Sequence, residues 1–124
     1  MMGQEKRKVS ICDDSMLIRK KLRDLLETEF DCEVVEAGNG QEGITSYDQT
    51  RPEVVFMDIV MPVCDGLSAL QEIKRLDQAA NVVMLSSTGT SAKLVQALKL
   101  GANNFIQKPY DREQIAKAIS SIHK

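Results

Sequence analysis

The stretch EVVFMD, residues 53–58, decides the fold class of this chain of 124 residues. Four apolar residues stand in succession before Asp58, without the alternation of apolar and polar residues that a half-exposed strand shows. A strand that is apolar on both faces is typical of the centre of a parallel sheet covered by helices on both sides. Residues 53–58 therefore predict an α/β fold with this strand near its centre.

Strand-like and helix-like segments alternate on both sides of this stretch. The other strands are expected at residues 9–12, 32–37, 81–86 and 103–107. Each strand is followed by a segment with apolar residues at helical spacing. Five βα units with short connections predict a parallel five-stranded sheet between two layers of helices.

Capping residues and apolar stripes place the helices more closely. Ser15 and Asp111 are suited to cap the first and last helices, and Gly101 is placed to end the fourth. The side chains expected to face the core include Leu17, Leu76 and Leu98. Four basic residues, Arg19, Lys20, Lys21 and Arg23, are expected to form a solvated face of the first helix.

The composition indicates one cytoplasmic domain. With 43% hydrophobic residues, we expect a single domain over residues 1–124, with its core at about 8–123 and no output domain. The formal net charge of −2 provides no basic field for nucleic acid, and no apolar run has the length of a membrane span. Since no signal peptide is visible, we expect a cytoplasmic location. We also expect a monomer, because nothing in the sequence demands a dimer, and partners that include neither nucleic acid nor membrane.

Polar side chains stand where the strands are expected to end. Asp13 and Asp14 follow the first strand, Asp58 ends the third, Ser86 ends the fourth and Lys108 follows the fifth. The carboxyl ends of parallel strands form one ligand crevice, so these side chains should converge there. Three adjacent carboxylates repel one another unless a cation joins them, and Mg²⁺ with its oxygen ligands fits that requirement.

This constellation predicts a magnesium-assisted phosphoryl site. Asp58 would be the nucleophile towards phosphorus, and Asp13 and Asp14 would hold Mg²⁺. Lys108 would offer its ammonium to the phosphoryl oxygens, and the hydroxyl of Ser86 would donate a further hydrogen bond. Each residue alone is more often a turn or cap residue, but their joint placement at the same edge of the sheet favours the functional interpretation.

These motifs resemble response-regulator receiver domains, most closely the stand-alone chemotaxis (CheY-like) type. The resemblance rests on CDDS at residues 12–15, FMDIVMP at 56–62, the Asp65-Gly66 pair, Ser86 and Lys108-Pro109, and it runs from residue 9 to 122. It implies a doubly wound, flavodoxin-like (βα)5 fold with strand order 2-1-3-4-5.

The resemblance also implies a role for each site residue. Asp58 would accept a phosphoryl group from the phosphohistidine of a histidine kinase. Asp14 would ligate Mg²⁺ directly and Asp13 through water, with Asp58 and the backbone carbonyl of Val60 completing the protein ligands. Ser86 would be the switch hydroxyl, whereas Phe105 falls at the position of the switch aromatic.

The expected function is that of a two-component response regulator, a phospho-acceptor and not a turnover enzyme. Its phosphorylation would switch the face formed by the fourth helix, fifth strand and fifth helix to bind a partner. A flagellar motor switch is the first candidate partner. The alternative role is that of a phosphorelay intermediate or another single-domain regulator. A phosphatase is a further candidate partner.

Two other classes of function compete with this interpretation. A binding module without phosphorylation would need no acidic set, although the whole set is present here. A phosphatase of the haloacid-dehalogenase type needs a second Asp where Val60 stands. Neither Val60 nor Thr88 can orient an attacking water through a carboxylate or amide, so we expect slow spontaneous dephosphorylation.

Overall fold

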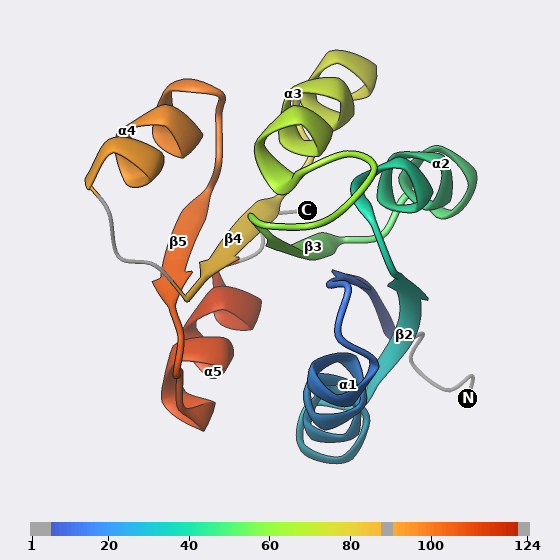
Figure 1. The fold of residues 1–124 in the computed structure, drawn as a ribbon. Helices are drawn as coiled ribbons and strands as arrows, with labels where there is room; N and C mark the ends of the chain where they lie inside the picture. The colour runs from blue at the N-terminus through green and yellow to red at the C-terminus, as the bar shows by residue number, and fades with distance from the viewer. Residues whose placement is uncertain (1–5, 88–90, 122–124) are drawn as a thin grey trace.

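Within residues 6–87 and 91–121, which the computed structural model describes, five parallel strands form one sheet (Figure 1). The strands are β1 (Arg7–Cys12), β2 (Cys32–Ala37), β3 (Val54–Asp58), β4 (Val82–Ser86) and β5 (Asn104–Gln107). Their order is β2-β1-β3-β4-β5, which confirms the expected doubly wound topology. β3 is the central strand, and all five of its residues are buried.

Helices cover both faces of the sheet. They are α1 (Met16–Glu29), α2 (Gly40–Thr50), α3 (Gly66–Leu76), α4 (Ser91–Lys99) and α5 (Arg112–Ser120). α1 and α5 lie on one face, and α2, α3 and α4 lie on the other (Figure 1). Alternate residues of β3 supply both cores: Val54 and Phe56 pack towards α1 and α5, whereas Val55 and Met57 pack towards the other three helices.

The expected helix ends are confirmed. The Ser15 hydroxyl accepts a hydrogen bond from the backbone N–H of Ile18, and Asp111 forms a reciprocal capping box with Gln114. After α4, Gly101 has a φ of +101°, a left-handed conformation that glycine adopts without steric cost. In the described part of the chain, no helix has the length and apolar character of a membrane span.

Three leucines that we expected to face the core are exposed instead. Leu17 is 63% exposed, Leu98 is 52% exposed and Leu76 is 38% exposed. Leu98 follows buried Ala97, and one residue turns a helix by about 100°, which carries the side chain off the buried stripe. Leu76 is the last residue of α3 and Leu17 lies in the first turn of α1, so each of them lies at a helix end.

Candidate functional site

Three carboxylates converge at the carboxyl edge of the sheet. Asp13 and Asp14 follow β1, and Asp58 is the last residue of the neighbouring strand β3. One oxygen from each carboxylate lies within 4.8 Å of the others. Asp13 and Asp58 are buried, whereas Asp14 is exposed. The parallel pairing of β1 with β3 brings about the convergence expected from the sequence.

Lys108 follows β5, and its side chain extends past the end of β4 to the carboxylates. Its Nζ lies 3.0 Å from Asp13 Oδ2 and 3.3 Å from Asp58 Oδ1. The backbone N–H of Lys108 donates to the carbonyl of Ser86, which holds the start of the β5–α5 connection against the end of β4. The Lys108–Pro109 peptide bond is cis. One lysine therefore pairs with two carboxylates that come from two different strands.

Burial and charge act against each other at Asp58 and Lys108. Burial raises the pKa of the Asp58 carboxyl; the charge of Lys108 acts to lower it and the charge of Asp13 to raise it. Burial acts to lower the pKa of Lys108, but its contacts with Asp13 and Asp58 outweigh that effect and raise it. One ammonium beside three carboxylates leaves excess negative charge, which favours a divalent cation with oxygen ligands.

Asp13 is fixed by hydrogen bonds on every polar side. Its Oδ1 accepts from the backbone N–H of Ser15 at 2.9 Å, and its Oδ2 accepts from Lys108. Its own backbone N–H donates to the carbonyl of Ala37 at the end of β2. Because both carboxylate oxygens already accept hydrogen bonds, Asp13 has less capacity for a further direct ligand than exposed Asp14 has.

The loop at residues 59–65 follows Asp58 and folds back onto it. The N–H of Gly66 donates to the carbonyl of Ile59 at 2.7 Å. A Cβ on Gly66 would lie 2.0 Å from the carbonyl oxygen of Asp58, so only glycine fits this approach. Val60, the expected carbonyl ligand, lies in this loop with a largely exposed side chain. In the sequence Gly66 is recognisable only as part of a motif, and its close packing against Asp58 was not predicted.

Ser86 and Phe105 occupy the neighbouring ends of β4 and β5. Ser86 is buried at the end of β4 and lies beside Gln107 in the strand register. Phe105 is half-buried and packs against the core on the α2–α4 face. Thr88, which we expected to influence dephosphorylation, lies outside the described residues.

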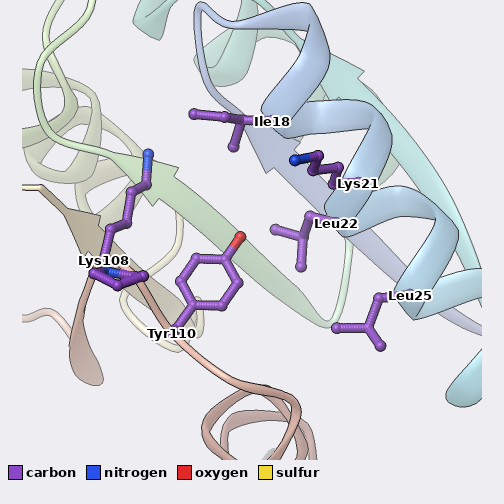
Figure 2. A pocket seen from close by; sticks show the side chains of 7 residues that line it. Ile18, Lys21, Leu22, Leu25, Lys108 and Tyr110 are labelled. Atoms are coloured by element: carbon purple, nitrogen blue, oxygen red, sulfur yellow. The ribbon is translucent and has the colours of Figure 1, made fainter.

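A groove of about 390 Å³ runs from this site between α1 and the β5–α5 connection (Figure 2). Its lining residues are Ile18, Lys21, Leu22, Leu25, Lys108, Pro109 and Tyr110. In Figure 2 the ring of Tyr110 lies across from the α1 side chains, beside Lys108. Burial raises the pKa of Tyr110, and the nearby charge of Lys108 acts against that rise. Lys108 thus belongs to both the acidic cluster and the groove.

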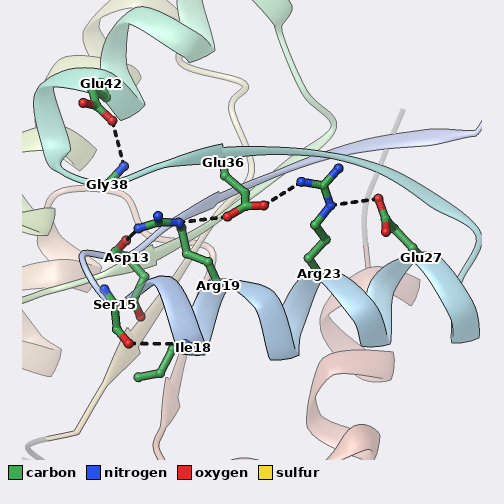
Figure 3. A network of polar contacts seen from close by, with 9 residues as sticks. All are labelled: Asp13, Ser15, Ile18, Arg19, Arg23, Glu27, Glu36, Gly38 and Glu42. Atoms are coloured by element: carbon green, nitrogen blue, oxygen red, sulfur yellow. Dashed lines mark hydrogen bonds and ion pairs between the residues drawn. The ribbon is translucent and has the colours of Figure 1, made fainter.

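The basic cluster on α1 is not a uniformly solvated face. Lys20 and Lys21 are exposed, as expected. The side chain of Arg19 is only 16% exposed, however, and its Nη1 donates to the backbone carbonyl of Asp13 at 2.6 Å. Its position on the helix turns it towards the end of β2, where Glu36 lies (Figure 3). Periodicity on α1 could not reveal this contact, because the acceptor is a backbone atom of the preceding loop.

Comparisons with known proteins agree with this geometry. Residues 9–120 match the family model described as a response regulator receiver domain. The chain is 40% identical over 116 residues to the chemotaxis protein CheY of Halobacterium salinarum, which covers 94% of this chain and 96% of that protein. It is 39% identical over 118 residues to the chemotaxis protein CheY of Listeria monocytogenes, which covers 94% of this chain and 98% of that protein.

A solved structure has the same fold. One chain of the crystallised CheX–CheY–BeF3–Mg²⁺ complex from Borrelia burgdorferi superposes with a TM-score of 0.87 at 31% sequence identity. The superposition covers 94% of this chain and 88% of the other. The residues matched by the family model include the acidic cluster and Lys108.

Proposed function

Because the chain belongs to the response regulator receiver domain family, we propose that Asp58 accepts a phosphoryl group from a histidine kinase and that this switches the binding of a partner protein. The observation that carries the proposal is the convergence of Asp58 with Asp13, Asp14 and Lys108 at one edge of the sheet. A lone strand-end carboxylate would not support it.

The transfer needs one oxygen nucleophile and a means of neutralising charge. A carboxylate oxygen of Asp58 attacks the phosphorus of the phosphohistidine, the P–N bond breaks and a P–O bond forms. The departing imidazole takes its proton from water. Lys108 is held 3.3 Å from Asp58 Oδ1 and its raised pKa keeps it an ammonium, so it can donate to the phosphoryl oxygens.

The residues present fit a magnesium site. Mg²⁺ requires hard oxygen ligands and takes few carboxylates, and it would neutralise charge on the acidic residues and on the phosphoryl oxygens. Asp14 and Asp58, with the backbone carbonyl of Val60, would be its protein ligands. Asp13 would act through water, since both its carboxylate oxygens already accept hydrogen bonds.

Phosphorylation can alter the neighbouring face of the molecule through Ser86 and Phe105. A phosphoryl group adds about −1.5 to −2 charge at pH 7, which attracts the hydroxyl of Ser86 and the ammonium of Lys108. Movement of buried Ser86 would open space that half-buried Phe105 can enter. The face formed by α4, β5 and α5 would then present a different surface to its partner.

The partner we propose is a protein of the chemotaxis machinery, with a flagellar motor switch as the first candidate. The two curated relatives described above, each matched over most of its length, are named as chemotaxis proteins, which favours this role over a phosphorelay intermediate. A relative has been crystallised in complex with CheX, so a second regulatory protein such as a phosphatase is a further candidate partner. We propose that the chain acts as a cytoplasmic monomer and as a phospho-acceptor, not as a turnover enzyme.

Intact mass after incubation with acetyl phosphate tests this function. We expect one phosphoryl adduct that needs Mg²⁺ and is absent from Asp58→Ala. Asp65→Asn is a matched control, because Asn retains the cap at the start of α3 that Asp65 provides. An adduct that persists in Asp58→Ala would overturn the assignment of the acceptor, and no adduct on the folded wild-type protein would favour a binding module.

A further inference from the structure

We propose that Arg19 is a positioning residue, which fixes the peptide between Asp13 and Asp14 and thereby sets the affinity of the acidic site for Mg²⁺. This inference rests on the magnesium site proposed above. The contacts of Arg19 carry it: Nη1 donates to the carbonyl of Asp13 at 2.6 Å, and Nε donates to Glu36 Oε1 at 2.9 Å (Figure 3). Arg19 therefore joins the loop after β1 to the end of β2.

The carbonyl that Arg19 contacts belongs to the peptide that leads into Asp14. A peptide unit is planar, so fixing its oxygen fixes the direction in which the next Cα lies. The N–H of Asp13 is already held by the carbonyl of Ala37, and its side chain by Ser15 and Lys108. With Arg19 added, the backbone that aims the exposed carboxylate of Asp14 is held at both ends of the Asp13 residue.

A guanidinium is suited to this task and an ammonium is not. Its donors form a rigid planar fork, so one side chain can serve the Asp13 carbonyl and the Glu36 carboxylate in fixed directions. Glu36 is held in turn by Arg23, whose Nη1 lies 2.6 Å from Glu36 Oε2. The pKa of Glu36 is lowered chiefly by its hydrogen bond to Arg23, with burial opposing and Arg19 adding to the effect.

Arg23 provides a matched control on the same helix. It shares Glu36 with Arg19, but its Nε pairs with Glu27, whereas Arg19 contacts the loop that carries Asp13 and Asp14 (Figure 3). Its side chain is 42% exposed, against 16% for Arg19. If these arginines only join α1 to β2, replacing either one should affect the acidic site equally.

The test compares Arg19→Lys, Arg19→Gln and Arg23→Lys. Mg²⁺ binding is followed by titration calorimetry and by the amide resonance of Asp14 in NMR spectra, with urea denaturation confirming that each variant is folded. Because Arg19→Lys preserves the charge, it separates the fork geometry from electrostatic attraction. Replacing a residue that orients a metal ligand typically weakens metal binding by about tenfold or more. We therefore expect both Arg19 variants to bind Mg²⁺ roughly tenfold more weakly than the wild type.

Arg23→Lys should keep the wild-type affinity, and the Asp14 amide resonance of the metal-free protein should shift only in the Arg19 variants. Unchanged Mg²⁺ affinity in Arg19→Lys and Arg19→Gln would overturn the inference while leaving the metal site intact. An equal loss in Arg23→Lys would also overturn it, since the effect would then be one of helix packing. No Mg²⁺ binding by the wild-type protein would reject the proposed metal site itself, and the role of Arg19 with it.

Discussion

Val63 has a left-handed backbone conformation, which suits a β-branched side chain poorly. Its φ is +68°, and its β-branched side chain is 84% exposed in the loop that follows Asp58. A left-handed conformation costs an ordinary L-residue about 1–2 kcal/mol, whereas asparagine tolerates it better. We therefore expect Val63→Asn to raise the free energy of unfolding by about 1 kcal/mol, measured by urea denaturation.

Val60→Asn is the control for this substitution, since it makes the same change at an exposed valine of the same loop without a positive φ. It should leave the free energy of unfolding nearly unchanged. A similar gain in both variants would mean that relief of exposed apolar surface, and not of backbone strain, stabilises the loop.

The same Val60→Asn variant should shorten the lifetime of the acyl phosphate. Val60 stands two residues after Asp58 and its side chain cannot orient water, whereas an amide can. An amide orients water without removing its proton, so we expect an increase in dephosphorylation rate of roughly tenfold, below that of a full general base. The decay of the phosphoryl adduct by intact mass measures it; an unchanged decay would show that side chains at this position do not reach the attacking water.

Gly66 couples the start of α3 to the strand that carries Asp58. An added Cβ would meet the Asp58 carbonyl oxygen at 2.0 Å, a backbone atom that cannot move without displacing the end of β3. We expect Gly66→Ala to lower the free energy of unfolding by about 1–3 kcal/mol, the usual cost of overpacking a close contact. It should also weaken Mg²⁺ binding, measured by calorimetry.

Gly38→Ala is the matched control, because its added Cβ would lie at an ordinary distance of 3.5 Å from Arg19 Nη1. It should preserve both stability and Mg²⁺ affinity. If Gly66→Ala behaves like Gly38→Ala, the loop at residues 59–65 adjusts independently of the site.

Tyr47 and Asp77 join the end of α2 to the end of α3. The buried Tyr47 hydroxyl donates to Asp77 Oδ2 at 2.8 Å, and this hydrogen bond is the main cause of the lowered pKa of Asp77. A carboxyl whose pKa is lowered by folding stabilises the protein above its unfolded pKa, and that stabilisation is lost as the pH falls through its folded pKa.

Tyr47→Phe should therefore cost most at neutral pH, about 1.5 kcal/mol for a hydrogen bond to a charged group. The cost should be smaller at pH 3, because the stabilisation that comes from the lowered pKa of Asp77 begins to be lost once the pH falls below the ordinary Asp pKa of about 3.9. Urea denaturation at both pH values measures the difference. In an Asp77→Asn background the pH dependence should disappear, and its persistence would assign it to another carboxyl.

The elements were predictable because each carries a local signal. The structure confirms the predicted places of the apolar run in β3, of the cap residues Ser15 and Asp111, and of the left-handed Gly101. Exposed leucines such as Leu17 were wrongly assigned to the core. The pattern of apolar residues locates the buried face of a helix only to within about one residue, so a leucine at its margin can be assigned to the wrong side.

The convergence of Asp13, Asp14 and Asp58 was also predictable, because the carboxyl ends of parallel strands lie at one edge of the sheet. The contacts of Arg19 and Gly66 were not. In both, the partner is a backbone carbonyl, of Asp13 and of Asp58 respectively, and residue types carry no signal for such an acceptor.

At the acidic site, the arrangement that serves the proposed function lowers the stability of the metal-free protein. Burial is the largest cause of the raised pKa of Asp58, so ionised Asp58 destabilises the metal-free protein. For a carboxyl with a raised folded pKa, this penalty develops as the pH rises from the unfolded pKa through the folded pKa. Natural functional sites commonly carry such a cost, and a single stabilising substitution typically adds about 0.5–2 kcal/mol of stability.

Without Mg²⁺ at pH 7, Asp58→Asn should therefore be more stable than the wild type by about 1 kcal/mol, and the advantage should shrink in acid. A ligand that binds only the folded state stabilises it by about 2.7 kcal/mol at a concentration of 100 Kd, so Mg²⁺ should raise the stability of the wild type more than that of Asp58→Asn. Urea denaturation with and without Mg²⁺ measures both effects. A metal-free wild type more stable than Asp58→Asn would mean that the Lys108 ion pair outweighs the burial of Asp58. Lys108→Met would then destabilise the wild type more than Asp58→Asn, in which Lys108 still pairs with Asp13.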